Sequence, residues 1–217
     1  MDPGWLSNAY LVADEPGGTA VFIDSGAPLQ PLHEEVERQR LTVTHLLTTH
    51  GDPDHIAGDD ELRSRYELEV AQGPLETGGL RFEALSTPGH ADPHFTFLCD
   101  GVAFTGDILF RDAVGGGRDV PAIRRSVMDV LMKLPPETRV LPGHTEETTI
   151  GREWEENPFV RVWRRLESEG GERVRVGSHE GVLVVWSPDY DGKGKGLVRF
   201  ESGVEVIVGG SQIERLA

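Results

Sequence analysis

The pattern of hydrophobic and polar positions over the first 170 residues indicates an alternation of short strands and amphipathic helices. Apolar, β-branched runs of about four to eight residues are typical of buried strands, and several of them end at a turn residue. Apolar residues spaced three or four apart among charged ones are typical of helices that bury one face. The expected strands are 20–24, 42–49, 80–87, 95–99, 102–105 and 138–141. The expected helices are 32–40, 56–66, 122–134 and 152–169, the last with an interruption at Asn157-Pro158.

The pattern changes near residue 170. Short apolar runs at 174–176, 182–186, 197–200 and 204–208 are separated by Gly, Ser, Asp and Lys, and they have no helical spacing. We therefore predict an α/β domain over residues 1–170 and a small all-β module over residues 171–217, either an SH3-like barrel or a sheet extension.

Composition narrows the classes of partner. Lys and Arg total 21 against 37 Asp and Glu, a formal charge of −16, which disfavours nucleic acid and anionic membranes and leaves a small-molecule substrate as the expected partner. The single cysteine, Cys99, cannot form an internal disulfide, and no run of about 18 apolar residues could span a bilayer. Residues 1–5 lack the pattern of a signal peptide, so we expect a cytoplasmic protein. The oligomeric state is not predicted.

Candidate chemistry is concentrated directly after the strand at 42–49, where residues 50–55 read His-Gly-Asp-Pro-Asp-His. Imidazole and carboxylate groups are ligands that first-row divalent metals accept. Alternate residues in an extended turn point the same way, so His50, Asp52 and Asp54 are expected to converge, with His55 at the start of the next helix. Taken alone, the segment could also be a solvated acidic loop.

Three distant segments repeat one pattern, in which a residue of ligand type follows a glycine that ends a strand. They are Pro88-Gly89-His90, Thr105-Gly106-Asp107 and Pro142-Gly143-His144. Loops at one edge of a sheet meet in a layered α/β fold, so these residues are expected to gather around the first cluster. The repetition favours a metal site over a solvated loop.

The series His50-x-Asp52-x-Asp54-His55, His90, Asp107 and His144 resembles the HxHxDH, His, Asp, His series of the metallo-β-lactamase superfamily. The resemblance covers residues 5–159, and Asp24 matches the family's first motif, where the aspartate supports the site. Residues 142–159 and 105–118 are similar to glyoxalase II-type hydroxyacylglutathione hydrolases. The resemblance implies an αββα sandwich with metals at one edge, to which the small C-terminal all-β module is appended.

The resemblance also implies two divalent metal ions, which could be zinc, iron or manganese. It places His50, His90 and the position of Asp52 on the first ion, places Asp54, His55 and His144 on the second, and makes Asp107 the bridge. A hydroxide held between two metals attacks a carbonyl whose oxygen a metal polarises. We assign catalytic roles to Asp54 and Asp107.

Asp52 departs from the family pattern, which usually has a second histidine at this position. A carboxylate makes the centre one charge unit more negative, so it acidifies water less and favours iron or manganese over zinc. Alternatively, Asp52 turns away from the centre and only the second site fills.

The function that we predict is hydrolysis of a thioester, with hydroxyacylglutathione-like substrates first among the candidates. The alternatives are a mononuclear iron persulfide dioxygenase, a lactone or ester hydrolase, and a non-catalytic metal-binding scaffold. Retention of His55 and His144 favours a two-metal site over a mononuclear one. His94 matches no ligand position, and Tyr190 is interpreted as a packing residue of the C-terminal module.

Overall fold

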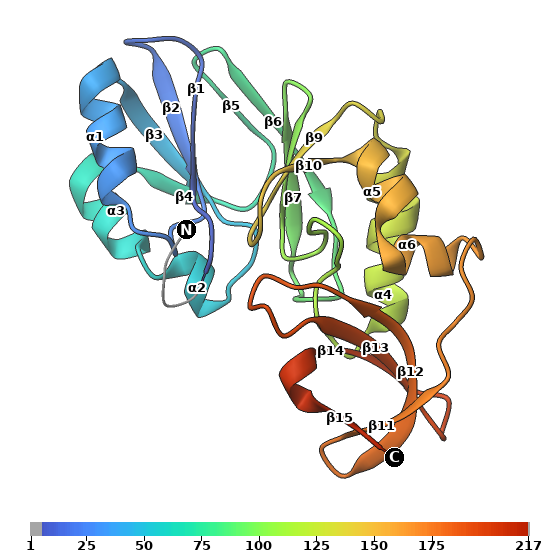
Figure 1. Cartoon of the computed structure of the whole chain (residues 1–217). Coiled ribbons are helices and arrows are strands. Elements are labelled where there is room, and N and C mark those ends of the chain that lie inside the picture. The colour runs from blue at the N-terminus through green and yellow to red at the C-terminus, as the bar shows by residue number, and fades with distance from the viewer. Residues whose placement is uncertain (1–5, 217) are drawn as a thin grey trace.

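The computed structural model describes residues 6–216. Two β-sheets lie face to face, with helices on the outer side of each, and a third sheet follows at the C-terminus (Figure 1). The predicted αββα sandwich with a C-terminal β appendage is confirmed.

The first sheet has the strand order β1-β2-β3-β4, and helices α1 and α3 cover its outer face (Figure 1). Its strands are β1 Tyr10–Ala13, β2 Thr19–Ile23, β3 Thr42–Leu47 and β4 Glu69–Ala71, and its helices are α1 Gln30–Gln39 and α3 Asp59–Tyr66. The short helix α2, Pro53–Ile56, lies between β3 and α3 in the chain.

The second sheet has the order β10-β9-β8-β7-β6-β5, and helices α4, α5 and α6 lie on its outer side (Figure 1). Its strands are β5 Leu75–Thr77, β6 Leu80–Ser86, β7 Phe95–Cys99, β8 Val102–Gly106, β9 Arg139–Pro142 and β10 Thr148–Thr149. The helices are α4 Val120–Arg125, α5 Ile150–Glu156 and α6 Pro158–Trp163.

Strand β2 shows how the sequence pattern produces the sandwich. It is buried on both faces, because alternate side chains of a strand point to opposite sides of the sheet. Val21 and Ile23 pack with Phe97 in the core between the two sheets. Phe22 points the other way and packs with Leu62 beneath the helices. Truncation of either phenylalanine to alanine would cost about 3–5 kcal/mol.

The strand directions bring the predicted ligands to one edge of the sandwich. Strands β8 and β9 run parallel, and β6 has the same direction, because β7 is antiparallel to both β6 and β8. The residues that follow the carboxyl ends of these strands therefore lie at the same edge of the second sheet. The carboxyl end of β3 in the first sheet faces them (Figure 1).

The C-terminal sheet is entirely antiparallel, with the order β14-β13-β12-β11-β15. Its strands are β11 Glu172–Val176, β12 His179–Ser187, β13 Lys195–Phe200, β14 Glu205–Gly209 and β15 Ile213–Arg215. Val185, Leu197 and Ile207 of this sheet share one hydrophobic core with Val160 and Trp163 of α6. The sheet is thus packed against the sandwich, and an independent domain boundary at residues 170–171 stays a prediction.

The predicted interruption at Asn157-Pro158 of the helical segment 152–169 is confirmed, but the predicted C-terminal end of this segment is wrong. The segment is divided at Asn157, whose side chain accepts hydrogen bonds from the first backbone N–H groups of α6, and α6 ends at Trp163. Beyond it, Arg165 adopts a left-handed φ of 61°, and the N–H of Gly170 donates to the carbonyl of Val184 in the C-terminal sheet. The N–H groups of Arg165 and Leu166 donate to the carbonyls of Val162 and Arg161, so a local turn closes the helix before the chain joins the C-terminal sheet.

Other predicted boundaries also differ from the structure. The helix expected over 122–134 becomes α4, a π-helical turn over Ser126–Val130 and a 3-10 turn over Leu131–Lys133. The helix expected over 56–66 is divided between α2 and α3. The short strands β1, β4, β5, β10 and β15 were not predicted. Among residues 6–216, no helix combines the length and apolar character needed to cross a membrane.

Candidate metal centre

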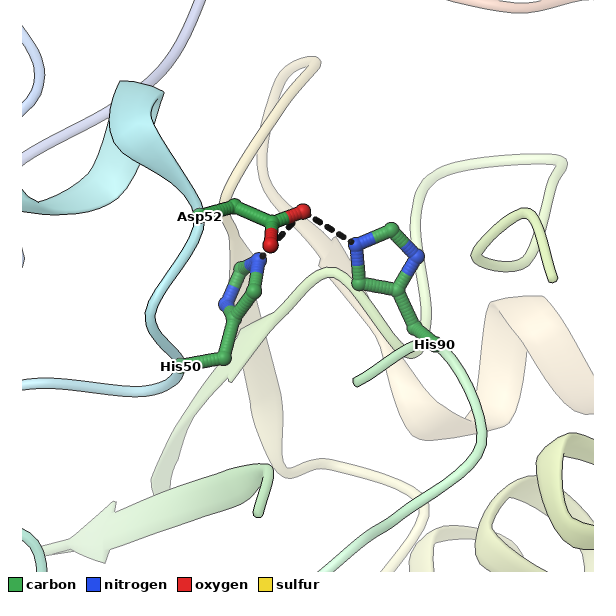
Figure 2. Close-up of side chains that lie close together, drawn as sticks. All are labelled: His50, Asp52 and His90. Carbon is green, nitrogen blue, oxygen red and sulfur yellow. Dashed lines mark hydrogen bonds and ion pairs between the residues drawn. The ribbon is translucent and has the colours of Figure 1, made fainter. Parts of the chain in front are cut away.

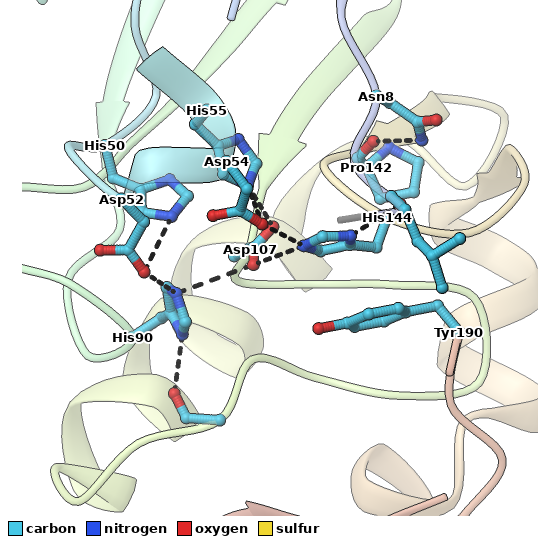
Figure 3. A network of polar contacts seen from close by, with 12 residues as sticks. Asn8, His50, Asp52, Asp54, His55, His90, Asp107, Pro142, His144 and Tyr190 are labelled. Atoms are coloured by element: carbon cyan, nitrogen blue, oxygen red, sulfur yellow. Dashed lines mark hydrogen bonds and ion pairs between the residues drawn. The ribbon is translucent and has the colours of Figure 1, made fainter. Parts of the chain in front are cut away.

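All seven residues predicted as metal ligands lie together at the strand edge of the sandwich (Figure 3). They are His50, Asp52, Asp54, His55, His90, Asp107 and His144. The side chains of His50, His55 and His144 are buried, whereas those of Asp52 and Asp54 are 50% and 26% exposed. Buried donors with one side open to solvent are typical of a catalytic metal site.

The backbone conformation differs from the prediction at Asp54. Asp52 is extended, with φ −70° and ψ 143°, as predicted. Asp54 and His55, however, lie in helix α2, which begins at Pro53, so Asp54 does not continue the extended turn. The first turn of this helix directs the side chains of Asp54 and His55 toward His144, whereas the side chain of Asp52 lies with His50 and His90.

The first group consists of His50, Asp52 and His90 (Figure 2). Asp52 Oδ2 lies 3.6 Å from His50 Nε2 and 3.3 Å from His90 Nε2. One donor atom from each residue lies within 4.8 Å of the others. Asp52 therefore faces both histidines and is not turned away.

The second group consists of Asp54, His55 and His144 (Figure 3). Asp54 Oδ2 lies 3.3 Å from His144 Nε2 and 3.9 Å from His55 Nε2. Asp107 stands between the groups: its Oδ1 is 3.3 Å from His55 Nε2, and its Oδ2 is 3.2 Å from His144 Nε2 and 3.7 Å from His90 Nε2. This position suits a carboxylate that bridges two ions.

Backbone carbonyls fix the orientation of two of the histidine rings. His90 Nδ1 donates to the carbonyl of Gly116, and His144 Nδ1 donates to the carbonyl of Leu6, each over 2.8 Å. A carbonyl only accepts hydrogen bonds, so both Nδ1 atoms carry a proton and both Nε2 atoms face the centre, where each can offer its lone pair to a metal once it is deprotonated.

Asp24 orients the rings of the other two histidines, His55 directly and His50 through Thr49. Its Oδ2 accepts from His55 Nδ1 and from the hydroxyl of Thr49, both over 2.8 Å, and its Oδ1 accepts from the Thr49 N–H. Since the Thr49 hydroxyl proton points to Asp24, its oxygen is free to accept from His50 Nδ1 at 3.0 Å. Asp24 therefore supports the site without being a ligand, as the resemblance implied.

The donor set fits divalent metal ions. His50 Nε2, His55 Nε2 and Asp107 Oδ1 are buried, and none of them has a hydrogen-bond partner among residues 6–216. Buried polar atoms are nearly always satisfied in folded proteins, because an orphaned group costs free energy. These three atoms converge with the other nitrogens and carboxylates on a common space, which is the arrangement that a cation would satisfy.

The charges of the protein groups alone point to proton release when a metal binds. Burial lowers the pKa of His55, but the carboxylates of Asp107 and Asp24 outweigh burial and raise the pKa to about 11. For His144, burial is again outweighed, here by Asp107 and Asp54, and the pKa rises to about 9. Burial alone would raise the pKa of Asp107, but His144 and His55 hold it well below its usual range. A metal therefore competes with protons for both histidines.

The glycines before the ligands permit the close packing of the centre. A Cβ atom at Gly143 would overlap the carboxylate of Asp107 and the ring of His55. Gly106 has a left-handed φ of 47°, and a Cβ there would crowd the side chains of Thr49 and His94. The repeated glycine-ligand pattern thus has a steric reason.

His94 is a positioning residue that sequence reasoning did not assign. It is buried, and its Nε2 accepts from the backbone N–H of Asp107 at 3.1 Å, so its Nδ1 donates to the hydroxyl of Thr87 at 2.9 Å. Burial lowers its pKa, so the ring stays neutral. His94 orients the bridging carboxylate through the backbone, and no spacing signal could have indicated this role.

Tyr190 is the second residue that sequence reasoning did not place at the site. It lies in the loop between β12 and β13, and its ring stacks on that of His144, with centroids 4.0 Å apart and planes at 9°. Its hydroxyl end points toward the side of the site where His90 lies (Figure 3). The loop is held by an ion pair of Lys195 and Asp189, 3.2 Å apart. The C-terminal sheet therefore contributes a side chain to the metal centre.

The chain is similar to several known proteins in sequence and in fold. Hydroxyacylglutathione hydrolase of Xylella fastidiosa is 32% identical over 65% of this chain and 61% of the relative. The crystal structure of ETHE1 from Myxococcus xanthus superposes with a TM-score of 0.63 at 29% identity, over 77% of this chain and 89% of that one. The crystal structure of TTHA1623 in a di-iron-bound form has a TM-score of 0.62 at 30% identity, over 73% and 98% of the two chains.

The family comparison covers most of the sandwich and all of the predicted ligands. A statistical model of the metallo-beta-lactamase superfamily matches residues 2–76 and 67–144, a span that ends at His144, the last residue of the ligand series. Together with the αββα sandwich and the convergent donors at its edge, this match defines the family. The chain belongs to the metallo-β-lactamase superfamily.

Proposed function

We propose that the chain is a metal-dependent hydrolase that cleaves a thioester, with hydroxyacylglutathione-like compounds as the first substrates to test. The observation that carries the proposal is the position of Asp107, whose carboxylate contacts both groups of donors. The similarity to hydroxyacylglutathione hydrolase supports a thioester substrate, and the di-iron-bound neighbour supports a two-metal centre.

Two divalent ions in this site would acidify a water molecule and polarise the carbonyl of the substrate. His50, Asp52 and His90 would hold one of them, and Asp54, His55 and His144 the other, with Asp107 between the two. No serine or cysteine nucleophile is required for such a reaction, and Cys99 lies in the core between the sheets.

The residues at the open side of the centre have roles in binding and proton transfer. Asp54 is partly exposed, and the neighbouring His144 holds its pKa below the usual range, so it stays ionised and can accept a proton near the water. Burial raises the pKa of Tyr190, so the phenol stays protonated and can donate a hydrogen bond to the substrate. Asp54 and Asp107 remain the residues that we propose as catalytic.

The choice of metal follows from Asp52. This carboxylate stands in the first group where the family usually has a histidine, and it makes the centre one charge unit more negative. Harder ions tolerate an additional oxygen ligand better than zinc does. We therefore propose iron or manganese as the native metal.

The proposal is tested by loading the chain separately with zinc, iron and manganese and assaying a hydroxyacylglutathione, a lactone and a glutathione persulfide. We expect metal-dependent hydrolysis of the thioester, lost in Asp107→Ala and kept in Asp14→Ala, a change at an exposed carboxylate in the β1–β2 turn. Oxygen consumption with the persulfide and one iron per chain would instead establish the mononuclear alternative. Metal binding without any turnover would establish the scaffold alternative.

A further inference from the structure

A large cavity lies between the C-terminal sheet and the rim of the metal centre. Its volume is about 1050 Å³, at the upper end of what small-molecule sites occupy. His90 and the loop Gly116–Arg118 line it on the side of the sandwich. The β11–β12 turn, the β13–β14 turn and strand β14 line it on the side of the C-terminal sheet.

The wall of the cavity is fixed to a predicted metal ligand. Gly117 and Ile207 of β14 exchange two backbone hydrogen bonds of 2.9 Å, so β14 is paired with the loop of the sandwich. The adjacent carbonyl, that of Gly116, accepts the hydrogen bond that orients His90. Cavity and metal centre therefore share one rigid connection, and His90 belongs to both.

The lining is apolar in a chain that is otherwise strongly acidic. Val176, Phe200, Val204, Val206 and Val208 contribute to it, and Val204 is 56% exposed to solvent. Exposed apolar side chains that line one concave surface usually mark a ligand-binding site.

Charge limits the kind of ligand further. Among the described residues that line the cavity, Arg118 alone carries a fixed charge, and no carboxylate lines it. A cationic ligand would find no counter-ion in the cavity. An apolar group, neutral or with a negative end, suits this lining.

We propose that this cavity binds the apolar acyl group of the substrate, with the carbonyl carbon placed beside His90 at the metal centre. The inference rests on the proposed hydrolase function and narrows it, because it selects, among hydroxyacyl and other thioesters, those with long hydrophobic acyl chains over those with short ones. The thiol part of the substrate leaves toward the open side of the site, where Asp54 and Tyr190 lie.

The test measures binding without turnover. Acetate, butyrate, hexanoate and octanoate, the carboxylate products of such a reaction, are titrated calorimetrically into the metal-loaded chain. Each methylene that enters the cavity should tighten Kd by about fourfold. A Kd that does not change with chain length would overturn the assignment of the cavity.

Two matched variants separate the cavity from the rest of the sheet. Val204→Asn places an amide in the cavity and should weaken octanoate binding by about fivefold or more, with acetate unchanged. Val182→Asn changes an equally small residue of the same sheet that is 36% exposed and lies outside the lining, and it should have no effect. Equal losses in both variants would also overturn the assignment.

The binding measurements test the cavity separately from the proposed hydrolase function. If octanoate binds as expected but no thioester is hydrolysed, the cavity stands and the proposed hydrolase function fails. If thioesters of all lengths are hydrolysed at equal kcat/KM and alkanoates bind equally, the hydrolase function stands and the cavity assignment fails.

Discussion

Replacement of Asp24 by asparagine perturbs the support beneath the metal centre without changing a ligand. The carboxylate is buried and accepts three hydrogen bonds, from the Thr49 N–H, the Thr49 hydroxyl and His55 Nδ1. An asparagine has the same shape, but only one of its two terminal atoms accepts. If its oxygen faces the Thr49 N–H, its NH₂ group faces the proton on His55 Nδ1.

The structure sets the size of the effect. The Thr49 hydroxyl can rotate, but the N–H of His55 cannot, so at least one buried donor loses its partner. This costs about 1–3 kcal/mol of folding free energy. The His55 ring can avoid this lost hydrogen bond only by moving its proton from Nδ1 to Nε2, the atom that faces the metal. Affinity for a metal should therefore fall about 10- to 100-fold, as is usual when a ligand's supporting hydrogen bond is removed.

The assay is a competition for zinc with a chromophoric chelator, together with urea unfolding followed by circular dichroism. Asp14→Asn is a matched control, because the Asp14 carboxylate also accepts three hydrogen bonds, from the backbone of Glu15, Thr19 and Gly79, far from the site. We expect Asp14→Asn to leave the zinc affinity unchanged. Equal zinc affinities for Asp24→Asn and the unmodified chain would refute the reasoning that Asp24 fixes the tautomer of His55.

Three further predictions concern the centre itself. Asp52→His removes one negative charge, so it should shift metal preference toward zinc and move the ascending, low-pH limb of the pH–rate profile to lower pH by roughly one unit. Superimposable pH–rate profiles with the same metal would contradict this prediction. Tyr190→Phe should lower kcat/KM about tenfold with metal content unchanged, since a single hydrogen bond to the substrate is lost, and an unaltered kcat/KM would limit Tyr190 to packing against His144. Metal affinity should rise with pH between 6 and 8, by up to about a hundredfold per pH unit. The reason is that His55 and His144, with pKa values raised to about 11 and about 9, must each release a proton when a metal binds. An affinity that does not change with pH, measured by the same chelator competition, would contradict that charge assignment.

The sequence, through its motifs and the family resemblance that they carry, was sufficient to predict the sandwich and the residues that gather at its edge, whose role as metal ligands stays a prediction. Four of the candidate ligands, His50, His90, Asp107 and His144, follow closely on the carboxyl ends of β3, β6, β8 and β9, which meet at one edge of the sandwich. The other three lie within five residues of His50, so position in the chain determined position in space. The glycines of this pattern have a steric reason, because a Cβ atom would overlap Asp107 at Gly143 and would crowd Thr49 and His94 at Gly106.

Contacts between distant segments could not be predicted in the same way. His94 acts through the backbone N–H of Asp107, and no spacing connects the two residues. Tyr190 reaches His144 only because the C-terminal sheet packs on the sandwich through a shared core. The pairing of Gly170 with Val184, where the chain joins the C-terminal sheet, likewise connects distant segments. These features follow from tertiary packing, which local periodicity does not encode.

The metal content of the purified chain tests the two-metal centre most directly. Protein produced without a metal-binding tag, loaded with iron or manganese and then passed over a desalting column, is analysed by elemental mass spectrometry. The two donor groups on either side of Asp107 predict close to two ions per chain, falling to one or fewer in Asp107→Ala, because that carboxylate contacts both groups. One tightly held ion per chain, unchanged by Asp52→Ala, would contradict the account.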